Sequence, residues 1–269
     1  MHMHDGGTTT DRLISAAEVL FASHGIDGVS LREINRAAGA KNASALQYHF
    51  RDRDGLLRAL MTKHRRDVEA RRHAMLDAYE ADGRDDLRAL AGALVRPLAA
   101  KLSDSDGGPQ YVQILADLTN RPRAVVDPAD LDDPASSIYR WRQLVGGLLA
   151  EDVTRLHRRF AAIRFSAHEI ARRARSGPHT DDRLFTSDLI DLVTGMLSAP
   201  LSDETRRLDA ERTRSARRDG RGREGPTAAR ASGRAATAGD ATADDDASAD
   251  DDASGDDGTT GDATGRAAP

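Results

Sequence analysis

The sequence predicts an all-α protein with a three-helix N-terminal head, a helical body and a disordered C-terminal tail. Composition favours helices over sheet, because aromatic residues make up only 4% of the 269 residues while Ala, Leu and Arg are abundant. Apolar residues also recur at spacings of three and four along most of residues 10–198. These patterns predict about nine helices and no convincing strand.

The first predicted helix lies within residues 10–28. Its apolar side chains share one face of a helix, and a glycine marks its exit. The face consists of Leu13, Ile14, Ala17, Leu20 and Phe21. This helix is expected to form one wall of the head.

Residues 30–57 predict a helix-turn-helix. Ser30 and Glu33 have the spacing of a capping box, in which each side chain satisfies a backbone N–H of the other residue. Val29 and Ile34 have the spacing of a hydrophobic staple, which fixes the angle at which the chain enters the helix.

The helix-turn-helix span runs from Leu31 to Phe50. Gly39 tolerates the left-handed conformation that ends the first helix in a tight turn. Asn42 is expected to cap a second, short helix that buries Leu46 and Phe50.

The outward side of the second helix is polar and suited to DNA. Its side chains are donors for phosphates and base edges. The candidate DNA contacts are Ser30, Arg32, Lys41, Asn42, Ser44, Gln47, Tyr48, His49 and Arg51. Residues 10–60 hold seven Lys and Arg against six Asp and Glu, so DNA affinity depends on the placement of donors more than on bulk charge.

The end of this segment resembles a known family. The run Leu46-Gln47-Tyr48-His49-Phe50, followed by Arg51, Asp54, Leu56 and Leu57, is similar to the signature that closes the DNA-binding head of the tetracycline-repressor (TetR) family of bacterial regulators. Residues 10–28 resemble that family's first helix and its glycine-marked exit. The resemblance covers residues 8–60. It implies base contacts near the start of the second helix and phosphate contacts at its end.

The sequence departs from the family pattern at three points. Asn35 stands where the family usually has Ala, at a position packed between the two helices. One extra residue separates Gly39 from Tyr48, and Gln47 stands where a tyrosine is common. The framework of the head therefore transfers more directly than the base-reading contacts at Lys41–Gln47.

Residues 61–202 are predicted to form a helical ligand-binding and dimerisation domain. The expected helices cover residues 53–80, 85–103 with a kink at Pro97, 110–119, a stretch from Ala135 that is broken near Asp152–Thr154, and 182–198. The last stop signals are Gly177-Pro178 and Pro200. The basic run at residues 63–66 is either a solvated helix face or an extra phosphate contact.

The last two predicted helices each carry an apolar stripe. The residues of the stripes are Phe160, Ile163, Ala167, Ile170 and Ala174, and then Phe185, Leu189, Leu192 and Met196. From spacing alone these are either monomer core or an interface. The family resemblance implies that they pair with their copies in a four-helix homodimer interface.

The resemblance also implies a variable ligand domain in the middle helices. The best candidates for lining a small-molecule cavity are Tyr111, Gln113, Tyr139, Trp141 and Arg142, because pockets combine aromatic walls with a few polar groups. Ordinary packing or surface exposure is the alternative for each. The effector itself is not identified by the sequence.

Several chemistries find no support in the sequence. There is no cysteine, no P-loop, no dinucleotide-binding glycine motif and no catalytic serine elbow, and we expect no cofactor, no metal and no enzymatic activity. An apolar leader and a stretch long enough to span a membrane are also lacking, which predicts a cytoplasmic protein without membrane contact.

Residues 203–269 are predicted to be a disordered tail. An Arg- and Gly-rich part precedes residues 237–269, which hold ten Asp and one Arg, a local charge of −9. The tail is either solvated without function or its acidic end competes with DNA for the head.

The leading functional prediction is a repressor that occupies a palindromic double-stranded DNA operator as a homodimer and is released by a small-molecule effector. The alternative is a constitutive DNA-binding regulator whose C-terminal helices serve only for dimerisation.

Overall fold

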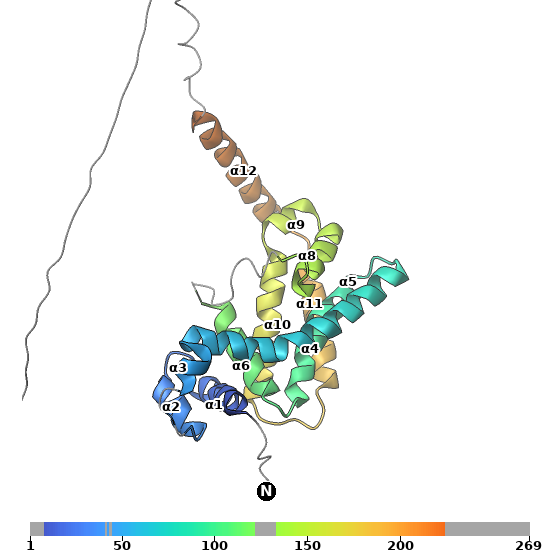
Figure 1. The fold of residues 1–269 in the computed structure, drawn as a ribbon. Coiled ribbons are helices and arrows are strands. Elements are labelled where there is room, and N and C mark those ends of the chain that lie inside the picture. Colours follow the sequence, from blue (N-terminus) through green and yellow to red (C-terminus); the bar gives the residue numbers. More distant parts are fainter. Residues whose placement is uncertain (1–7, 41, 43–44, 122–132, 224–269) are drawn as a thin grey trace, which may run out of the picture. The chain divides into compact units, whose positions relative to one another are not determined.

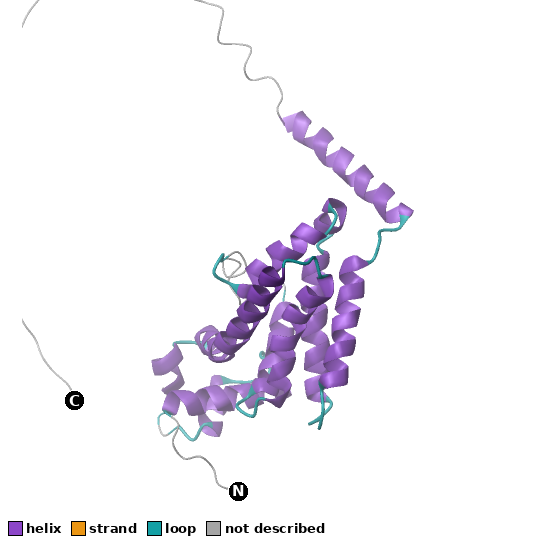
Figure 2. Cartoon of the chain, turned by 90° about the vertical axis from the view of Figure 1, so that its right-hand side faces the viewer, coloured by secondary structure: helices purple, strands orange, loops and turns teal. Residues whose placement is uncertain are grey.

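The computed structural model describes residues 8–40, 42, 45–121 and 133–223. Over these ranges it contains eleven α-helices, one 3-10 turn and no strand (Figure 1, Figure 2). The all-α prediction is confirmed, and the expected number of helices was too low by two. The helices that the sequence pattern did not predict are α9 (Glu151–Arg155) and α12 (Asp203–Arg223).

The head consists of α1 (Thr9–His24), α2 (Leu31–Ala37) and α3 (Ala45–Phe50), which gather at one end of α4 (Figure 1). The predicted capping box starts α2. Oγ of Ser30 accepts from the backbone N–H of Glu33 at 3.2 Å, and Oε2 of Glu33 accepts from the N–H of Ser30 at 2.7 Å. An equivalent box between Thr8 and Asp11 starts α1.

Helix α4 (Arg53–Asp82) runs without interruption from the head into the body. Oδ1 of Asp52 accepts from the N–H of Gly55 at 2.7 Å and caps the helix, and Gly83 ends it in a left-handed conformation with φ 67°. At a rise of 1.5 Å per residue the helix is about 45 Å long. One rigid element therefore connects the two parts of the protein.

The body is formed by α5 (Leu87–Ala99), the 3-10 turn η1 (Ala100–Ser103), α6 (Gly108–Thr119), α8 (Ser137–Leu148), α9, α10 (Arg158–Arg175) and α11 (Arg183–Ser198). Helix α10 packs against α6 and α11, and α5 packs against α4, α8 and α11. The stretch from Ala135 is interrupted near Asp152–Thr154 as predicted, but these residues themselves lie inside α9. The chain turns instead at residues 149–150 and again at His157, whose φ of 57° makes a corner that hydrophobic spacing does not reveal.

Pro97 lies inside α5, which continues to Ala99 and then tightens into η1. Because proline has no N–H, the carbonyl of Ala93, four residues earlier, loses its helical donor. Nε of the buried Arg72 donates to that carbonyl at 3.2 Å, and its Nη1 donates to Oγ of Ser137 at 2.9 Å. The proline thus supplies an acceptor through which α5 is tied to α4 and α8.

Helix α12 overturns the prediction that disorder begins at residue 203. The helix has no apolar stripe and relies on local polar contacts instead. Oγ of Ser202 accepts from the N–H of Thr205 at 3.2 Å, and Arg212 pairs with Asp209 at 3.0 Å. Residues 224–269, which include the acidic segment, lie outside the described residues.

Within the described ranges, no single helix is long and apolar enough to cross a membrane. Helices α11 and α12 pass such a test only as a pair bent by 56°, on length and composition alone. The apolar residues Leu189, Ile190 and Val193 of α11 are buried in the protein core.

Candidate nucleic-acid interface

The recognition element of the head is α3, a six-residue helix fixed by its apolar side. Leu46 is 1% exposed and Phe50 is 8% exposed, and both belong to the same buried apolar cluster as Phe21 of α1. The intervening side chains of Gln47, Tyr48 and His49 are exposed. Buried anchors on one side thus present donors on the other, as the sequence predicted.

The connection into α3 follows the predicted turn in part. Gly39 has a φ of 63°, the left-handed conformation expected of it. The described helix starts at Ala45, whose N–H donates to the carbonyl of Asn42 at 3.0 Å, so Asn42 lies three residues before the helix and is not the residue next to it. Residues 43–44 lie outside the described residues.

The structure places the candidate DNA contacts in two groups. Arg32, Asn42, Gln47, Tyr48, His49 and Arg51 are exposed, whereas Lys41 and Ser44 fall outside the described residues. The ring of His49 also lies against α1, with Nδ1 at 3.3 Å from Oγ1 of Thr10. Their contact with DNA stays a prediction.

Ser30 has a structural task that competes with DNA contact. Its hydroxyl donates to Oε2 of Glu33 at 2.7 Å while it accepts from the N–H of the same residue. Hydrogen bonds from the backbone N–H and the hydroxyl of Ser30 lower the pKa of Glu33. The carboxylate form therefore holds the box together.

Arg53 is a functional residue that the sequence reasoning missed. Its Nη2 donates to the carbonyl of Val29 at 2.6 Å, and its Nη1 donates to the carbonyl of Ile26. Both acceptors lie in the loop between α1 and α2, so the first residue of α4 holds that loop and the start of α2. An arginine at the start of a helix carries no distinctive signal, and only the fold reveals this clamp.

The five predicted ligand residues do not gather around one cavity. Tyr111 and Trp141 are buried in the core, and Nε1 of Trp141 donates to the carbonyl of Leu90 at 2.7 Å. Burial raises the pKa of Tyr111 to about 12. Nε2 of Gln113 donates to the carbonyl of Pro109 within α6.

Tyr139 and Arg142 lie together on α8. The guanidinium of Arg142 lies 5.9 Å from the ring centre of Tyr139 and 4.8 Å from that of Phe160 on α10. The two therefore join α8 to α10. A ligand role for any of the five predicted residues stays untested.

Two cavities are lined by other residues. One, of about 410 Å³, lies between the α1–α2 loop and the end of α6, and is lined by polar groups that include Asp27 and Arg121, which pair at 2.6 Å. The other, of about 360 Å³, is lined by leucines and Val153 together with the polar residues Asp152, Ser198 and Arg206, where α5, α8, α9 and α11 meet the start of α12. Neither includes the five predicted residues.

The predicted dimer residues divide between core and surface. Ala167, Ile170 and Leu189 are buried within the chain itself, and their place in a dimer interface stays a prediction. Leu192 is 51% exposed. Phe160, Ile163, Ala174, Phe185 and Met196 are half-buried.

Sequence comparison places residues 13–60 in the family described as "Bacterial regulatory proteins, tetR family". No curated protein matches the chain by sequence. The matched residues span α2, α3, the turn between them and most of α1, together with the start of α4.

Solved structures with a similar arrangement share little sequence. NalD of Pseudomonas aeruginosa, the secondary repressor of the MexAB-OprM multidrug efflux pump, is 21% identical with a TM-score of 0.43, covering 72% of this chain and 98% of its own. The fatty acid degradation regulator FadR of Bacillus halodurans is 16% identical with a TM-score of 0.43, covering 71% and 99%. An alanine-substituted mutant of HlyIIR is 15% identical with a TM-score of 0.47, covering 74% and 100%. At these scores the likeness carries no argument about function.

The assignment thus depends on the head, where the family match coincides with two capped helices, a left-handed glycine and an outward polar recognition helix. Over residues 13–60 the chain therefore matches the tetR family of bacterial regulatory proteins.

Proposed function

We propose that this regulator is a repressor that binds a palindromic operator as a homodimer and is released by a small-molecule effector. The observation that carries the proposal is the presentation of Gln47 and Tyr48 on a helix that Leu46 and Phe50 anchor. In this proposal residues 8–60 bind DNA and residues 61–202 bind the effector and the second copy.

Dimerisation is supported by the outward side of α11. Leu184 is 83% exposed and Leu192 is 51% exposed on this helix. Together with the half-buried Phe185 and Met196 they provide apolar surface that a second copy would cover. A two-fold dimer reads two half-sites one helical turn apart, which a single head cannot do.

The cavity of about 360 Å³ supports an effector site in the body. Its volume lies within the range of small-molecule sites, and its walls include leucines and Val153. An effector for this site would combine apolar surface with polar groups suited to Asp152, Ser198 and Arg206. If the cavity binds nothing, the constitutive regulator is the better description.

The DNA part of the proposal is tested by selection of duplexes from a random pool with the full chain. We expect an inverted repeat with half-sites about 10 bp apart, protected as one footprint by a dimer. Recovery of no preferred sequence, or of a single half-site bound by a monomer, would contradict it.

The effector part is tested by a thermal-shift screen of metabolites that carry both apolar and polar groups. A compound that raises the Tm of the wild-type chain is expected to lose its effect on Ala150→Trp, because Ala150 is exposed at the cavity wall and a tryptophan there fills the space. The same compound should release the selected duplex. A ligand that stabilises both proteins equally binds elsewhere.

A further inference from the structure

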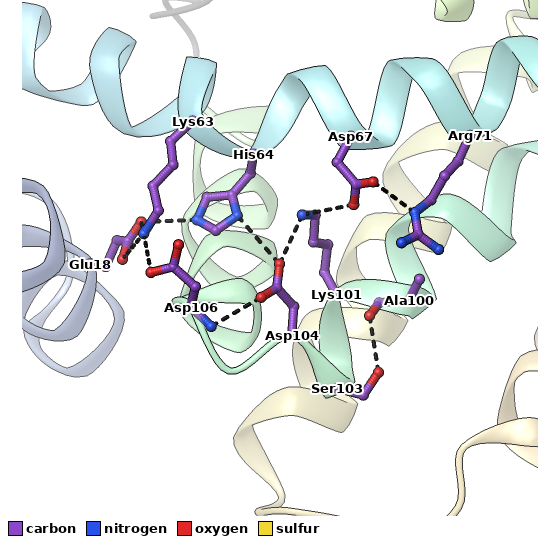
Figure 3. A network of polar contacts seen from close by, with 10 residues as sticks. All are labelled: Glu18, Lys63, His64, Asp67, Arg71, Ala100, Lys101, Ser103, Asp104 and Asp106. Carbon is purple, nitrogen blue, oxygen red and sulfur yellow. Dashed lines mark hydrogen bonds and ion pairs between the residues drawn. The ribbon is translucent and has the colours of Figure 1, made fainter. Parts of the chain in front are cut away.

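A chain of buried polar contacts joins α1 of the head to the turn that follows η1 in the body (Figure 3). Nε2 of His64 donates to Oε1 of Glu18 at 2.9 Å, and Nζ of Lys63 donates to the same oxygen at 3.1 Å. Lys63 also donates to Oδ1 of Asp106 at 2.8 Å. Glu18 of the head is thus linked through Lys63 to Asp106 of the body.

The series of polar contacts continues on the other side of the His64 imidazole. Nδ1 of His64 lies 4.0 Å from Oδ2 of Asp104, which accepts from Nζ of Lys101 at 2.9 Å. Lys101 also pairs with Asp67 of α4 at 3.1 Å. In Figure 3 Lys63, His64, Asp67 and Arg71 all hang from one side of α4, where they face α1 and η1.

Three of these groups, Glu18, His64 and Lys101, are withdrawn from water, whereas Asp106 and Arg71 are exposed. Glu18 and His64 are 2% exposed and Lys101 is 4% exposed. A buried ionic group is costly unless it is paired, so the position of each group is tightly coupled to that of its partner. His64 lies between the carboxylate of Glu18 and the carboxylate of Asp104.

Gly107 lies at the same head–body junction, which we define as the contacts among Glu18, Lys63, His64, Lys101, Asp104 and Asp106. It has a φ of 83°, and a Cβ at this position would collide with the carboxylate of Glu18. Gly107 is also the residue that precedes α6, so the carboxylate of Glu18 lies at the positive end of that helix. The turn at Gly107 therefore packs closely against the carboxylate of Glu18 in the head.

The geometry around His64 discriminates between its protonation states. Since Nε2 donates to Glu18, a neutral ring would present a lone pair at Nδ1 toward the carboxylate of Asp104. The imidazolium presents an N–H there instead. The ring of Tyr111 stacks on the imidazole at 4.7 Å, a contact that also favours a cation.

The charged groups around His64 also favour its protonated form. Glu18 from α1, Asp67 from α4, and Asp104 and Asp106 from the turn supply four carboxylates. Against them stand three cations, namely Lys63 and Arg71 from α4 and Lys101 from η1. Tyr111 from α6 is neutral. Asp106 and Arg71 are exposed to solvent, whereas a protonated His64 would place a positive charge between the carboxylates of Glu18 and Asp104.

We propose that Glu18 and His64 are positioning residues that latch the head to the Asp104–Gly107 turn, and that the latch is tighter when His64 is protonated. The proposal deepens the proposed function, because the latch would set the position of α3 for DNA. The position of the head, however, can be measured without DNA.

The absence of cysteine from the chain allows a direct test. Ser15→Cys in α1 and Arg96→Cys in α5, both exposed positions, take spin labels in the full chain. Labelled protein is mixed with a large excess of unlabelled protein so that each measured distance lies within one chain. Distance distributions are recorded by double electron–electron resonance at about pH 6 and pH 8, across the range in which histidine titrates.

We expect the wild-type distribution to be narrow at about pH 6 and broader at about pH 8. His64→Gln, which keeps one donor but cannot become charged, should give the broad distribution at both values. Asp104→Asn should also reduce the pH response, and Asp85→Asn, an exposed carboxylate outside the junction, should leave it unchanged. A wild-type distribution that does not change with pH would overturn the proposal, even if His64→Gln fails to fold.

Affinity for the selected duplex provides a second readout. His64→Gln should weaken binding by about fivefold at pH 6, the low end of ordinary coupling between two sites, and have less effect at pH 8. If no duplex is selected, the proposed function fails while the distance measurement still decides the latch. A pH-dependent distance with unchanged DNA affinity would overturn the link to DNA.

Discussion

The head and the body of this protein are held together by different means. The head packs α1 and two short helices, α2 and α3, which have only seven and six residues, around an apolar core. Helices of that length do not persist alone in water, so caps and the Arg53 clamp must hold them. The body consists mainly of longer helices that also bury charged groups such as Arg72 and Lys101.

The difference indicates where each part is sensitive. In the head, a few identifiable contacts position the recognition helix, so single substitutions there should affect both stability and DNA binding. In the body, packing is spread over many contacts. The predictions below test this contrast from the largest expected effect to the smallest.

Phe21→Ala should have the largest effect. Phe21 is fully buried in the head core, and removal of a buried phenylalanine costs about 3–5 kcal/mol of unfolding free energy. Urea denaturation followed by circular dichroism measures the loss. Val19→Ala, at a position that is 57% exposed on the same helix, serves as the control and should change stability by less than about 0.5 kcal/mol. Similar losses in both would argue against a single apolar core in the head.

Arg53→Met should destabilise the head by about 1.5–3 kcal/mol, because it removes charge-assisted hydrogen bonds to the carbonyls of Ile26 and Val29. DNA affinity should fall with it, since the start of α2 is released. Arg58→Met, at an exposed position of the same helix, is the matched control. If the two variants lose the same free energy of unfolding, the hydrogen bonds of Arg53 do not stabilise the head.

Gln47→Ala and Tyr48→Phe should separate residues that specify a sequence from residues that position the head. Loss of a base contact at Gln47 should cost roughly 1–3 kcal/mol on the selected duplex and relax the preference at one base pair in each half-site. Tyr48→Phe should weaken specific and non-specific DNA about equally, by about 1 kcal/mol. Competition binding with single-base variants measures both. The reverse pattern would mean that α3 is rotated relative to the bases.

Truncation in the C-terminal segment should have a small effect that depends on the cut. Removal of residues 203–269 breaks the ion pair between Arg155 and Asp209, whose nitrogen and oxygen lie 2.7 Å apart. Because Arg155 is partly exposed, water screens the pair and we expect only a small loss of stability. Removal of residues 224–269 should leave stability unchanged. Loss of the dimer after either cut, measured by sedimentation, would place the end of the domain later in the chain.

The smallest effect concerns the pH dependence of the α2 cap. The pKa of Glu33 is lowered from 4.5 by hydrogen bonds from Ser30, so the carboxylate stabilises the folded head above that pH. This stabilisation should disappear as the pH falls through the lowered pKa. The difference in Tm between wild type and Glu33→Gln should therefore be positive at neutral pH and vanish in acid. A difference that is constant with pH would assign the cap to hydrogen bonding without charge.

In the head, the expectations from sequence were largely confirmed because the relevant signals are local. A capping box involves residues three apart, and a left-handed glycine is required by its own turn. The apolar residues Leu46 and Phe50 have only one core available to them. Arg53 escaped notice because its partners lie 24 and 27 residues away.

In the body the same reasoning was less successful. Ala167, Ile170 and Leu189 share the spacing of an interface helix, yet the chain's own core covers them. Helix α12 was missed because charged pairs and a cap replace the apolar stripe on which the prediction depended.

The sequence by itself determined the helical class, the start of α2, the turn at Gly39 and the outward polar side of α3, since these depend on residues a few positions apart. The tertiary structure alone decided which apolar faces of α10 and α11 are covered, and that Glu18 meets His64 across 46 positions of sequence. The physical reason is that a periodic pattern predicts that one face of a helix is buried, but it does not predict which element packs against that face. Only the packed fold supplies the neighbour, and with it the charge and the hydrogen bond that each buried group requires.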